Sequence, residues 1–353
     1  MRQFFVTKPP RRQKGYILAL NIAVLALMLV GAAYMENRIS LARDLARAEK
    51  QRIDGEFAVA SAKARVLYLL SAAPRSRFGL GTLPNASVAL DGTPYRIGRE
   101  VIVNLQDIKG LFSLNTRALE GNGRPLLERL LATYDLDGET VGRLADTLLD
   151  YRDGDDLRHI NGAEKEDYAH AGKAGDIRNA DFLSPTEISR VLGFSEIFQR
   201  WPETGSLVDH LHVSRVLLFN PNTADWRILV AMTGIPAELA QSLVTSRRRG
   251  ETPDISQLLL SGTSSNPFSS AVMTTLFPSE TIIVTLRYVG SPSGVRMAVK
   301  HTPTFAHSPW IVQYTYRVPL PALTQEEIDA LPELPPLSSV RDLNAPYQVQ
   351  FPF

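Results

Sequence analysis

An uninterrupted apolar segment near the N-terminus constrains this chain more than any other feature. Residues 16–35 read YILALNIAVLALMLVGAAYM and contain no charged side chain. As a helix, a segment of this length extends about 30 Å, which matches the hydrocarbon thickness of a bilayer. Residues 1–15 carry five basic side chains and no acidic one, which favours a cytoplasmic N-terminus. The sequence therefore predicts a single transmembrane helix, with the bulk of the chain exported.

Three interpretations of this start remain open. A cleaved secretory signal would use Gly31-Ala32-Ala33 as its small-residue site, although the apolar run is long for one. The second interpretation is an uncleaved membrane anchor. The third follows from the junction Lys14-Gly15-Tyr16, where a basic leader ends in Gly and an aromatic residue opens the apolar helix. This junction resembles a prepilin-type leader, in which prepilin peptidase cleaves between Gly15 and Tyr16 and N-methylates Tyr16.

The helix is expected to continue beyond the membrane. Over residues 37–73, apolar side chains recur at spacings of three and four, with charged side chains between them. This is the amphipathic period of a helix that packs one face. Pro74 ends the pattern. We expect the second half to pack on the chain's own globular part, and the first half to remain available to neighbouring subunits.

Composition limits the chemistry of the remainder. Apolar residues make up 44% and charged residues 21%, as in ordinary globular proteins. The chain has no cysteine, which excludes disulfides, Cys-ligated zinc, iron–sulfur clusters and thiol catalysis. A net charge of +1 argues against a dedicated nucleic-acid binder. No nucleophile triad motif, zinc-protease motif or phosphate-binding loop is present, so we expect no enzyme.

Strand patterns occur at both ends of the globular part. Residues 87–97 predict a hairpin that turns at Asp91-Gly92, followed by a strand over 100–105. Residues 281–289, 295–301 and 310–318 alternate and are rich in β-branched and aromatic side chains. Between these groups the pattern is helical, with helices expected at 126–133 and 139–152. A Pro-rich tail follows from 319, with one short helix at 325–331.

Two helical hairpins follow one plan, offset by 99 residues, and the second resembles a helix-hairpin-helix motif. In it, Asn222 or Thr223 is expected to cap the first helix, and Pro236 opens the second. An exported DNA-binding protein is therefore an alternative function, with Arg247–Arg249 as a phosphate patch. Pro236 argues against it, because it replaces a turn glycine and has no N–H to offer a phosphate.

One acidic segment, DYRDGDDLRHINGAEKEDY at 150–168, stands out. Carboxylates at this density repel unless a cation or solvent offsets them. Ca²⁺ takes six to eight oxygen ligands, so this loop is a candidate calcium site, although its spacing is not that of an EF-hand. A solvated acidic loop is the plain alternative. A carboxylate pair for glycoside hydrolysis is a third, but no aromatic-rich sugar platform surrounds the segment.

Taken together, the chain resembles the K-type minor pseudopilins of type II secretion systems. Four segments carry the resemblance: KGYILALNIAVLALMLV; GLFSLNT; LLDYRDGDDLRHINGAEKEDY with the following RNADFLSPTEISRVLGFS; and LLFNPNTADWRILVAMTGIP. They span most of residues 14–250 in the family's order. The resemblance implies an α+β fold with a long N-terminal membrane helix, a pilin-like head with an antiparallel sheet, and a mostly helical inserted domain.

The resemblance also implies an organisation and partners. The expected parts are a leader (1–15), a transmembrane helix (16–36), its periplasmic continuation (37–73), a first β part (74–110), a helical domain (111–275), a second β part (276–318) and a tail (319–353). The implied partners are the I- and J-type minor pseudopilins, the major pseudopilin, prepilin peptidase and the inner-membrane assembly platform, and no nucleic acid is expected. The head would be periplasmic and the protein inner-membrane.

Two site expectations follow. Most pilin-like proteins carry Glu at the fifth mature residue, which is Leu20 here, and the K-type lacks it. The family also binds calcium in its globular domain, which makes Asp153, Asp155, Glu164 and Asp167 the candidate ligands. This chain departs from the family at Lys165, where an acid is usual. The expected function is a pseudopilin at the tip of the pseudopilus that initiates and caps its assembly.

Overall fold

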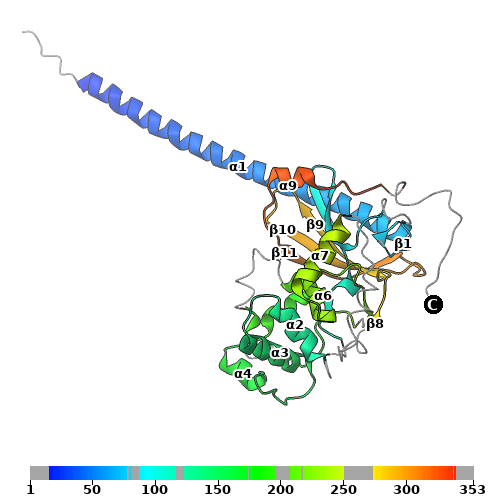
Figure 1. Cartoon of the computed structure of the whole chain (residues 1–353). Coiled ribbons are helices and arrows are strands. Elements are labelled where there is room, and N and C mark those ends of the chain that lie inside the picture. Colours follow the sequence, from blue (N-terminus) through cyan, green and yellow to red (C-terminus); the bar gives the residue numbers. More distant parts are fainter. Residues whose placement is uncertain are drawn as a thin grey trace, which may run out of the picture. The chain divides into compact units, whose positions relative to one another are not determined.

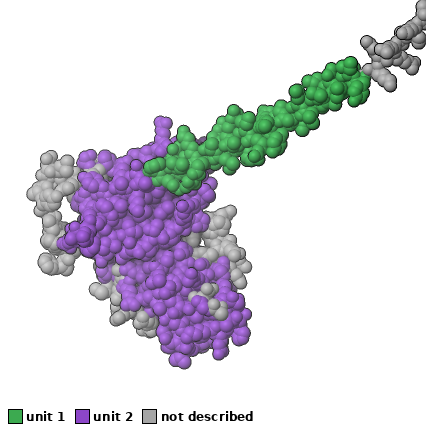
Figure 2. All heavy atoms as spheres, turned by 180° about the vertical axis from the view of Figure 1, so that it is seen from behind, with its two compact units in different colours: residues 1–57 green, residues 58–353 purple. Residues whose placement is uncertain are grey.

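The computed structural model describes residues 16–77, 79–81, 87–116, 119, 123–173, 175, 177–195, 207–215, 218–249, 273–336 and 338. The expected leader, with Gly15, and the tail from 339 lie outside the described residues. The chain divides into two compact units, residues 1–57 and 58–353 (Figure 2).

Helix α1 runs from Tyr16 to Ala72 and carries the apolar segment. By length and composition it is able to cross a membrane, and no other helix among the described residues meets that criterion. Its apolar side chains in unit 1 are exposed. Farther along, Arg52 pairs at 2.6 Å with both Glu49 and Glu56, one turn away on either side. The helix ends before Pro74, because proline has no N–H to continue the ladder.

The sheet of unit 2 has five antiparallel strands in the order β11-β10-β9-β4-β3. Its strands are β3 (Asp91–Ile97), β4 (Val101–Asp107), β9 (Thr281–Tyr288), β10 (Ser293–His301) and β11 (Trp310–Pro319). The last turns of α1 pack against this sheet, where Val66 and Leu70 share a core with Val103 and Leu286. The expectation that the second half of the N-terminal helix packs on the chain's own globular part is confirmed. Two short strands, β1 (Arg75–Ser76) and β2 (Gly79–Leu80), follow α1.

The expected hairpin at 87–97 is wrong in its turn. Asp91 and Gly92 lie inside β3, and the chain turns at 98–100 to pair β3 with β4. Gly92 does have the positive φ (+80°) that a type I′ turn requires, but it uses it in a register shift between Asp91 and Pro94. The Asp-Gly signal thus marks a register shift within β3, and the chain reverses at 98–100 instead, where Gly98 has φ +64°.

The polypeptide between β4 and β9 forms a mostly helical part of unit 2. In Figure 1, α2, α3 and α4 lie together, away from β9 and β10. Its elements in chain order are η2 (Ile108–Gly110), β5 (Phe112–Ser113), α2 (Arg124–Ala132), α3 (Gly138–Arg152), α4 (Lys165–His170), η4 (Pro185–Arg190), η5 (Leu207–His210), β6 (Leu211–His212), β7 (Leu218–Phe219), α6 (Trp226–Thr233), α7 (Ala237–Arg248) and β8 (Met273–Thr274). A second core fills it, with Leu130, Leu148 and Leu229 among its buried side chains.

Two of the segments that carry the resemblance contain an Asn-Thr pair, GLFSLNT and LLFNPNTADWRILVAMTGIP, and these asparagine-threonine motifs have structural roles. Asn115 donates from Nδ2 to the carbonyls of Phe182 (2.8 Å) and Val213 (2.7 Å). In the second motif, Asn220 and Thr223 donate to the buried carboxylate of Asp107 at 3.1 and 3.0 Å. Asp107 ends β4 and also accepts from the Ser279 N–H at 2.8 Å, just before β9. Its burial raises its pKa. This carboxylate therefore ties the sheet to the helical part.

The helical hairpin at 226–248 forms as expected, but its cap differs. Asp225, and not Asn222 or Thr223, caps α6, since its carboxylate accepts from the Arg227 N–H at 3.0 Å. Thr223 does not cap this helix, because its hydroxyl already donates a hydrogen bond to Asp107.

The tail contributes α9 (Gln325–Ala330), after which the backbone runs along the outer edge of β3. Leu334 is fully buried in the sheet core, so this part of the tail packs with unit 2.

Candidate metal centre

The carboxylates of the acidic segment gather where α3 ends. Asp150 lies in the last turn of α3 and is 0% exposed. Its Oδ1 accepts from the His159 N–H at 3.1 Å, and it also contacts Nδ1 of the same imidazole. Gly162 closes over it, because a Cβ at that position would overlap the Asp150 carboxylate. The returning loop thus covers a buried carboxylate, and glycine is what allows the approach.

Asp153 and Glu164 complete the cluster from either end of the loop. Asp153 follows α3 directly and Glu164 precedes α4, at 7% exposure. One oxygen of Asp153 and both oxygens of Glu164 are buried without a well-formed hydrogen bond among the described residues, although the Glu164 side chain faces the Asp167 N–H in a capping box. Buried polar atoms are rarely left unsatisfied in proteins, so these oxygens are available to a group that the described residues do not supply.

The electrostatics agree with this geometry. Burial, reinforced by the charges of Asp155 and Asp150, raises the pKa of Asp153 to about 6. Burial, reinforced by Asp150 and Asp153, raises the pKa of Glu164 to about 7. Both groups therefore hold their protons to a higher pH than free carboxyls do, and a nearby positive charge would favour their ionisation. A cation at this place would relieve both the desolvation and the mutual repulsion.

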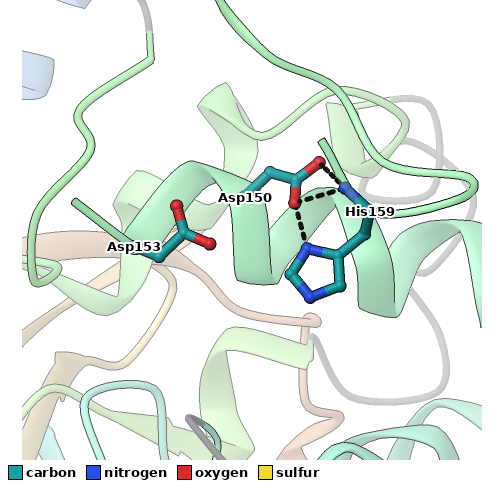
Figure 3. A group of neighbouring side chains, drawn as sticks. All are labelled: Asp150, Asp153 and His159. Atoms are coloured by element: carbon teal, nitrogen blue, oxygen red, sulfur yellow. Dashed lines mark hydrogen bonds and ion pairs between the residues drawn. The ribbon is translucent and has the colours of Figure 1, made fainter. Parts of the chain in front are cut away.

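Figure 3 shows the most compact set of possible ligand atoms. Single ligand atoms of Asp150, Asp153 and His159 all lie within 4.8 Å of one another. In the figure the Asp153 carboxylate faces the pair formed by Asp150 and His159. Carboxylate oxygens dominate the surroundings, and such donors suit a hard cation such as Ca²⁺. The residues therefore fit the cation that the resemblance implies.

The four expected ligands are placed differently from one another. Asp153 and Glu164 belong to the cluster. Asp155 is exposed, and its Oδ1 accepts from the Leu157 N–H at 2.8 Å. Asp167 accepts from the Glu164 N–H at 2.9 Å and pairs with Arg158 at 3.3 Å, so its oxygens are already engaged. Sequence reasoning left out Asp150 and His159. The acidic segment contained both, but only the fold shows that the helix end and the loop meet there.

The alternative phosphate patch does not assemble as three free cations. Arg247 donates to Asp91 Oδ2 at 3.2 Å and to the carbonyls of Pro221 (3.0 Å) and Ala224 (2.9 Å). It therefore connects α7 to the start of β3. Arg248 and Arg249 remain exposed at the C-terminus of α7, where the helix dipole favours cations. Contacts within the fold explain Arg247, and the C-terminal end of α7 explains Arg248 and Arg249, without a phosphate ligand.

The fold and the anchor helix define a class: an α+β pilin-like protein with one long N-terminal apolar helix. A chain in the crystal structure of the GspK-GspI-GspJ complex from the enterotoxigenic Escherichia coli type 2 secretion system has a similar fold, with a TM-score of 0.54 at 15% identity. The similarity covers 77% of this chain and 98% of that chain. The expected fold class is confirmed.

A second comparison is more specific. Residues 103–200 match the family model of type II secretion system protein K. This segment includes α2, α3 and α4, and hence the carboxylate cluster. No curated protein sequence matches the chain. The matched segment is thus similar to the K-type family that the sequence resembles, and the solved structure has the same fold.

Proposed function

We propose that the chain is a minor pseudopilin at the tip of a type II secretion pseudopilus, where it initiates and caps assembly for protein export across the outer membrane. The observation that carries the proposal is that the first 20 residues of α1 contain no carboxylate. In particular, the fifth of them, where most pilin-like proteins carry Glu, is Leu20. The family segment at 103–200 and the shared fold support the pseudopilin role itself.

The tip position follows from the cost of a buried charge. In a stack of such helices, a carboxylate at the fifth mature residue neutralises the terminal amine of the subunit above it. A charge within lipid or a packed helix bundle is costly without such a partner. A subunit with Leu20 offers no partner to the terminal amine of a subunit above it. The missing carboxylate has no cost if no subunit lies above it. It is therefore suited to the end of the fibre.

Maturation and partners follow from the same role. Prepilin peptidase would cleave between Gly15 and Tyr16 and methylate the new amine, leaving α1 as the first element of the mature chain. The N-terminus would lie in the cytoplasm before cleavage and the head in the periplasm, with α1 as a single-pass anchor in the inner membrane. The fold is shared with a chain of a three-protein complex, which supports I- and J-type minor pseudopilins as partners. The work is assembly, not catalysis.

The carboxylate cluster is proposed to hold Ca²⁺. Asp150, Asp153 and Glu164 would provide oxygens, with Asp155 near enough to raise the pKa of both Asp153 and Glu164. Asp167 would act indirectly, since it holds the Glu164 backbone at the start of α4. When bound, the ion supplies the positive charge that the cluster lacks. Its role is to fix the loop between α3 and α4.

Mass spectrometry of the mature N-terminus tests the maturation. A chain that begins at N-methylated Tyr16 is expected, and replacement of Gly15 should leave the leader attached. An intact Met1 in wild-type cells would contradict the proposal.

Gold labelling of assembled fibres tests the tip position, because labels are expected at fibre ends. Labels distributed along the shaft would refute capping even if processing is as expected.

A further inference from the structure

The loop between α3 and α4 displays two apolar side chains to solvent. Ile160 is 92% exposed and Leu157 is 76% exposed, more than any other large apolar side chain in the described part of unit 2. Single exposed apolar side chains are common on protein surfaces. Two within four residues, both largely exposed, form a surface that an association would bury with a gain in free energy. We call residues 157–160 the apolar loop.

The backbone on both sides of these side chains is fixed by hydrogen bonds. The His159 N–H donates to Asp150 at 3.1 Å and the Asn161 N–H to Asp146 Oδ2 at 3.1 Å. On the other side, Asn179 Nδ2 donates to the Asp155 carbonyl at 2.9 Å. The loop is thus anchored to buried acids of α3, while its apolar side chains point outward. A preorganised surface loses little entropy when a partner binds.

The charges around the apolar loop select the partner's chemistry. Residues 153–167 contain six carboxylates but only two permanent cations, Arg158 and Lys165. Both cations are already paired, Lys165 with Asp156 at 2.6 Å and Arg158 with Asp167 at 3.3 Å. The surface therefore stays negative even with one divalent cation bound. It disfavours anionic lipid and acidic proteins, and it is complementary to lysine or arginine side chains.

We propose that the apolar loop is a docking surface for a partner protein segment in which apolar side chains are flanked by lysine or arginine. Ile160 and Leu157 are buried by the partner's apolar side chains, and Glu166, exposed nearby on α4, faces its cations. This docking surface is a property separate from a position at the tip of the pseudopilus. Only the second experiment below, which measures secretion, rests on the proposed function.

The first experiment places the photoreactive residue p-benzoyl-phenylalanine at position 160 of the full chain in its own cells. The expected adduct is a protein peptide that contains apolar residues together with Lys or Arg. Adding Glu166→Lys should reduce its yield about fivefold or more, because like charges then meet. The same probe at Leu239, a partly exposed apolar residue on α7, is the control and should not give this adduct. Adducts with lipid only, with another copy of this chain, or with a peptide lacking basic residues would overturn the proposal.

The second experiment measures secreted protein in cells that carry Leu157→Ser with Ile160→Ser. Loss of one buried aliphatic side chain weakens an interface about tenfold or more, so secretion should fall at least that far while the level of the chain is unchanged. Leu239→Ser should secrete normally. Normal secretion by the double variant would overturn the docking surface. If cells lacking the whole chain also secrete normally, the proposed function fails instead, and the cross-linking result alone decides the docking surface.

Discussion

Removal of one charge from the carboxylate cluster, by Glu164→Gln, should stabilise the protein when no cation is present. The pKa values of Asp153 (about 6) and Glu164 (about 7) lie roughly two units above those of free carboxyls. One unit corresponds to about 1.4 kcal/mol, so the two shifts, if they were independent, would add up to roughly 6 kcal/mol. Their mutual repulsion enters both shifts, and Asp153 keeps some contact with solvent. We therefore expect a joint cost of about 3 kcal/mol, of which Glu164 carries about half.

The sign of the pH dependence follows from linkage. Because the folded pKa values are raised, the native state retains protons that the unfolded state has already released. Proton binding by these two carboxyls therefore stabilises the native state fully below the unfolded pKa values, near 4. This stabilisation is lost as pH rises through the folded pKa values of about 6 and 7. Glu164→Gln removes one of the two contributions. Its advantage over wild type should thus grow from near zero at about pH 4 to about 1.5 kcal/mol at about pH 8.

Urea unfolding of the full chain in detergent, with a chelator present, measures this difference at each pH. Glu166→Gln is the matched control, because Glu166 is two residues away but exposed, and its substitution should have a flat effect. With millimolar Ca²⁺ the order should reverse, since wild type gains a ligand-bound state and the variant loses a ligand. A Glu164→Gln effect that is flat with pH, or that grows toward acid, would refute the electrostatic reasoning.

Three further perturbations test other parts of the structure. Gly162→Ala should cost about 2 kcal/mol and weaken the thermal shift produced by Ca²⁺, because the new Cβ overlaps the buried carboxylate beneath the loop. Arg247→Ala breaks a buried ion pair and should lower the unfolding free energy by about 3 kcal/mol in urea, whereas exposed Arg249→Ala should change it by less than about 0.5 kcal/mol. Leu20→Glu supplies the carboxylate that a subunit above would need, so gold labels should appear away from fibre ends, whereas Leu25→Glu should not have this effect. Labels that stay confined to the ends in Leu20→Glu fibres would contradict the tip argument.

Much of the fold could be predicted from the sequence, because periodicity reports which faces are buried. The uncharged segment, Pro74 and the alternation at 281–318 gave the N-terminal helix and three strands nearly to the residue. The misplaced hairpin has a physical cause. Asp-Gly satisfies both a type I′ turn and a bulge, and only the pairing of β3 with β4 decides between them. Likewise Thr223 has the chemistry of a helix cap, but a long-range bond to Asp107 occupies its hydroxyl.

The candidate site was predictable as a segment and not as a set of ligands. Acidic residues along a chain indicate excess charge, but their roles depend on what the fold brings to each carboxylate. Asp167 is bonded to the backbone of α4 and to a neighbouring arginine, which no spacing rule reveals. Asp150 is buried by a loop that returns nine residues later, and the contact depends on the path of the loop and on Gly162.

A comparison of two buried acids within the same region shows why an external cation is expected. Asp146 is fully buried, yet the chain supplies its countercharge: Arg124 Nη1 forms an ion pair with Oδ1 at 2.8 Å, although without hydrogen-bond geometry, and Asn161 donates to Oδ2 at 3.1 Å. Glu164 is nearly as buried, and among the described residues no cation lies within ion-pair distance of its oxygens, which face only the backbone at the start of α4. A sequence selected for stability alone would pair both or expose both. The difference is understandable if Asp146 holds the loop permanently, while Glu164 and Asp153 are kept for a charge that arrives from solution.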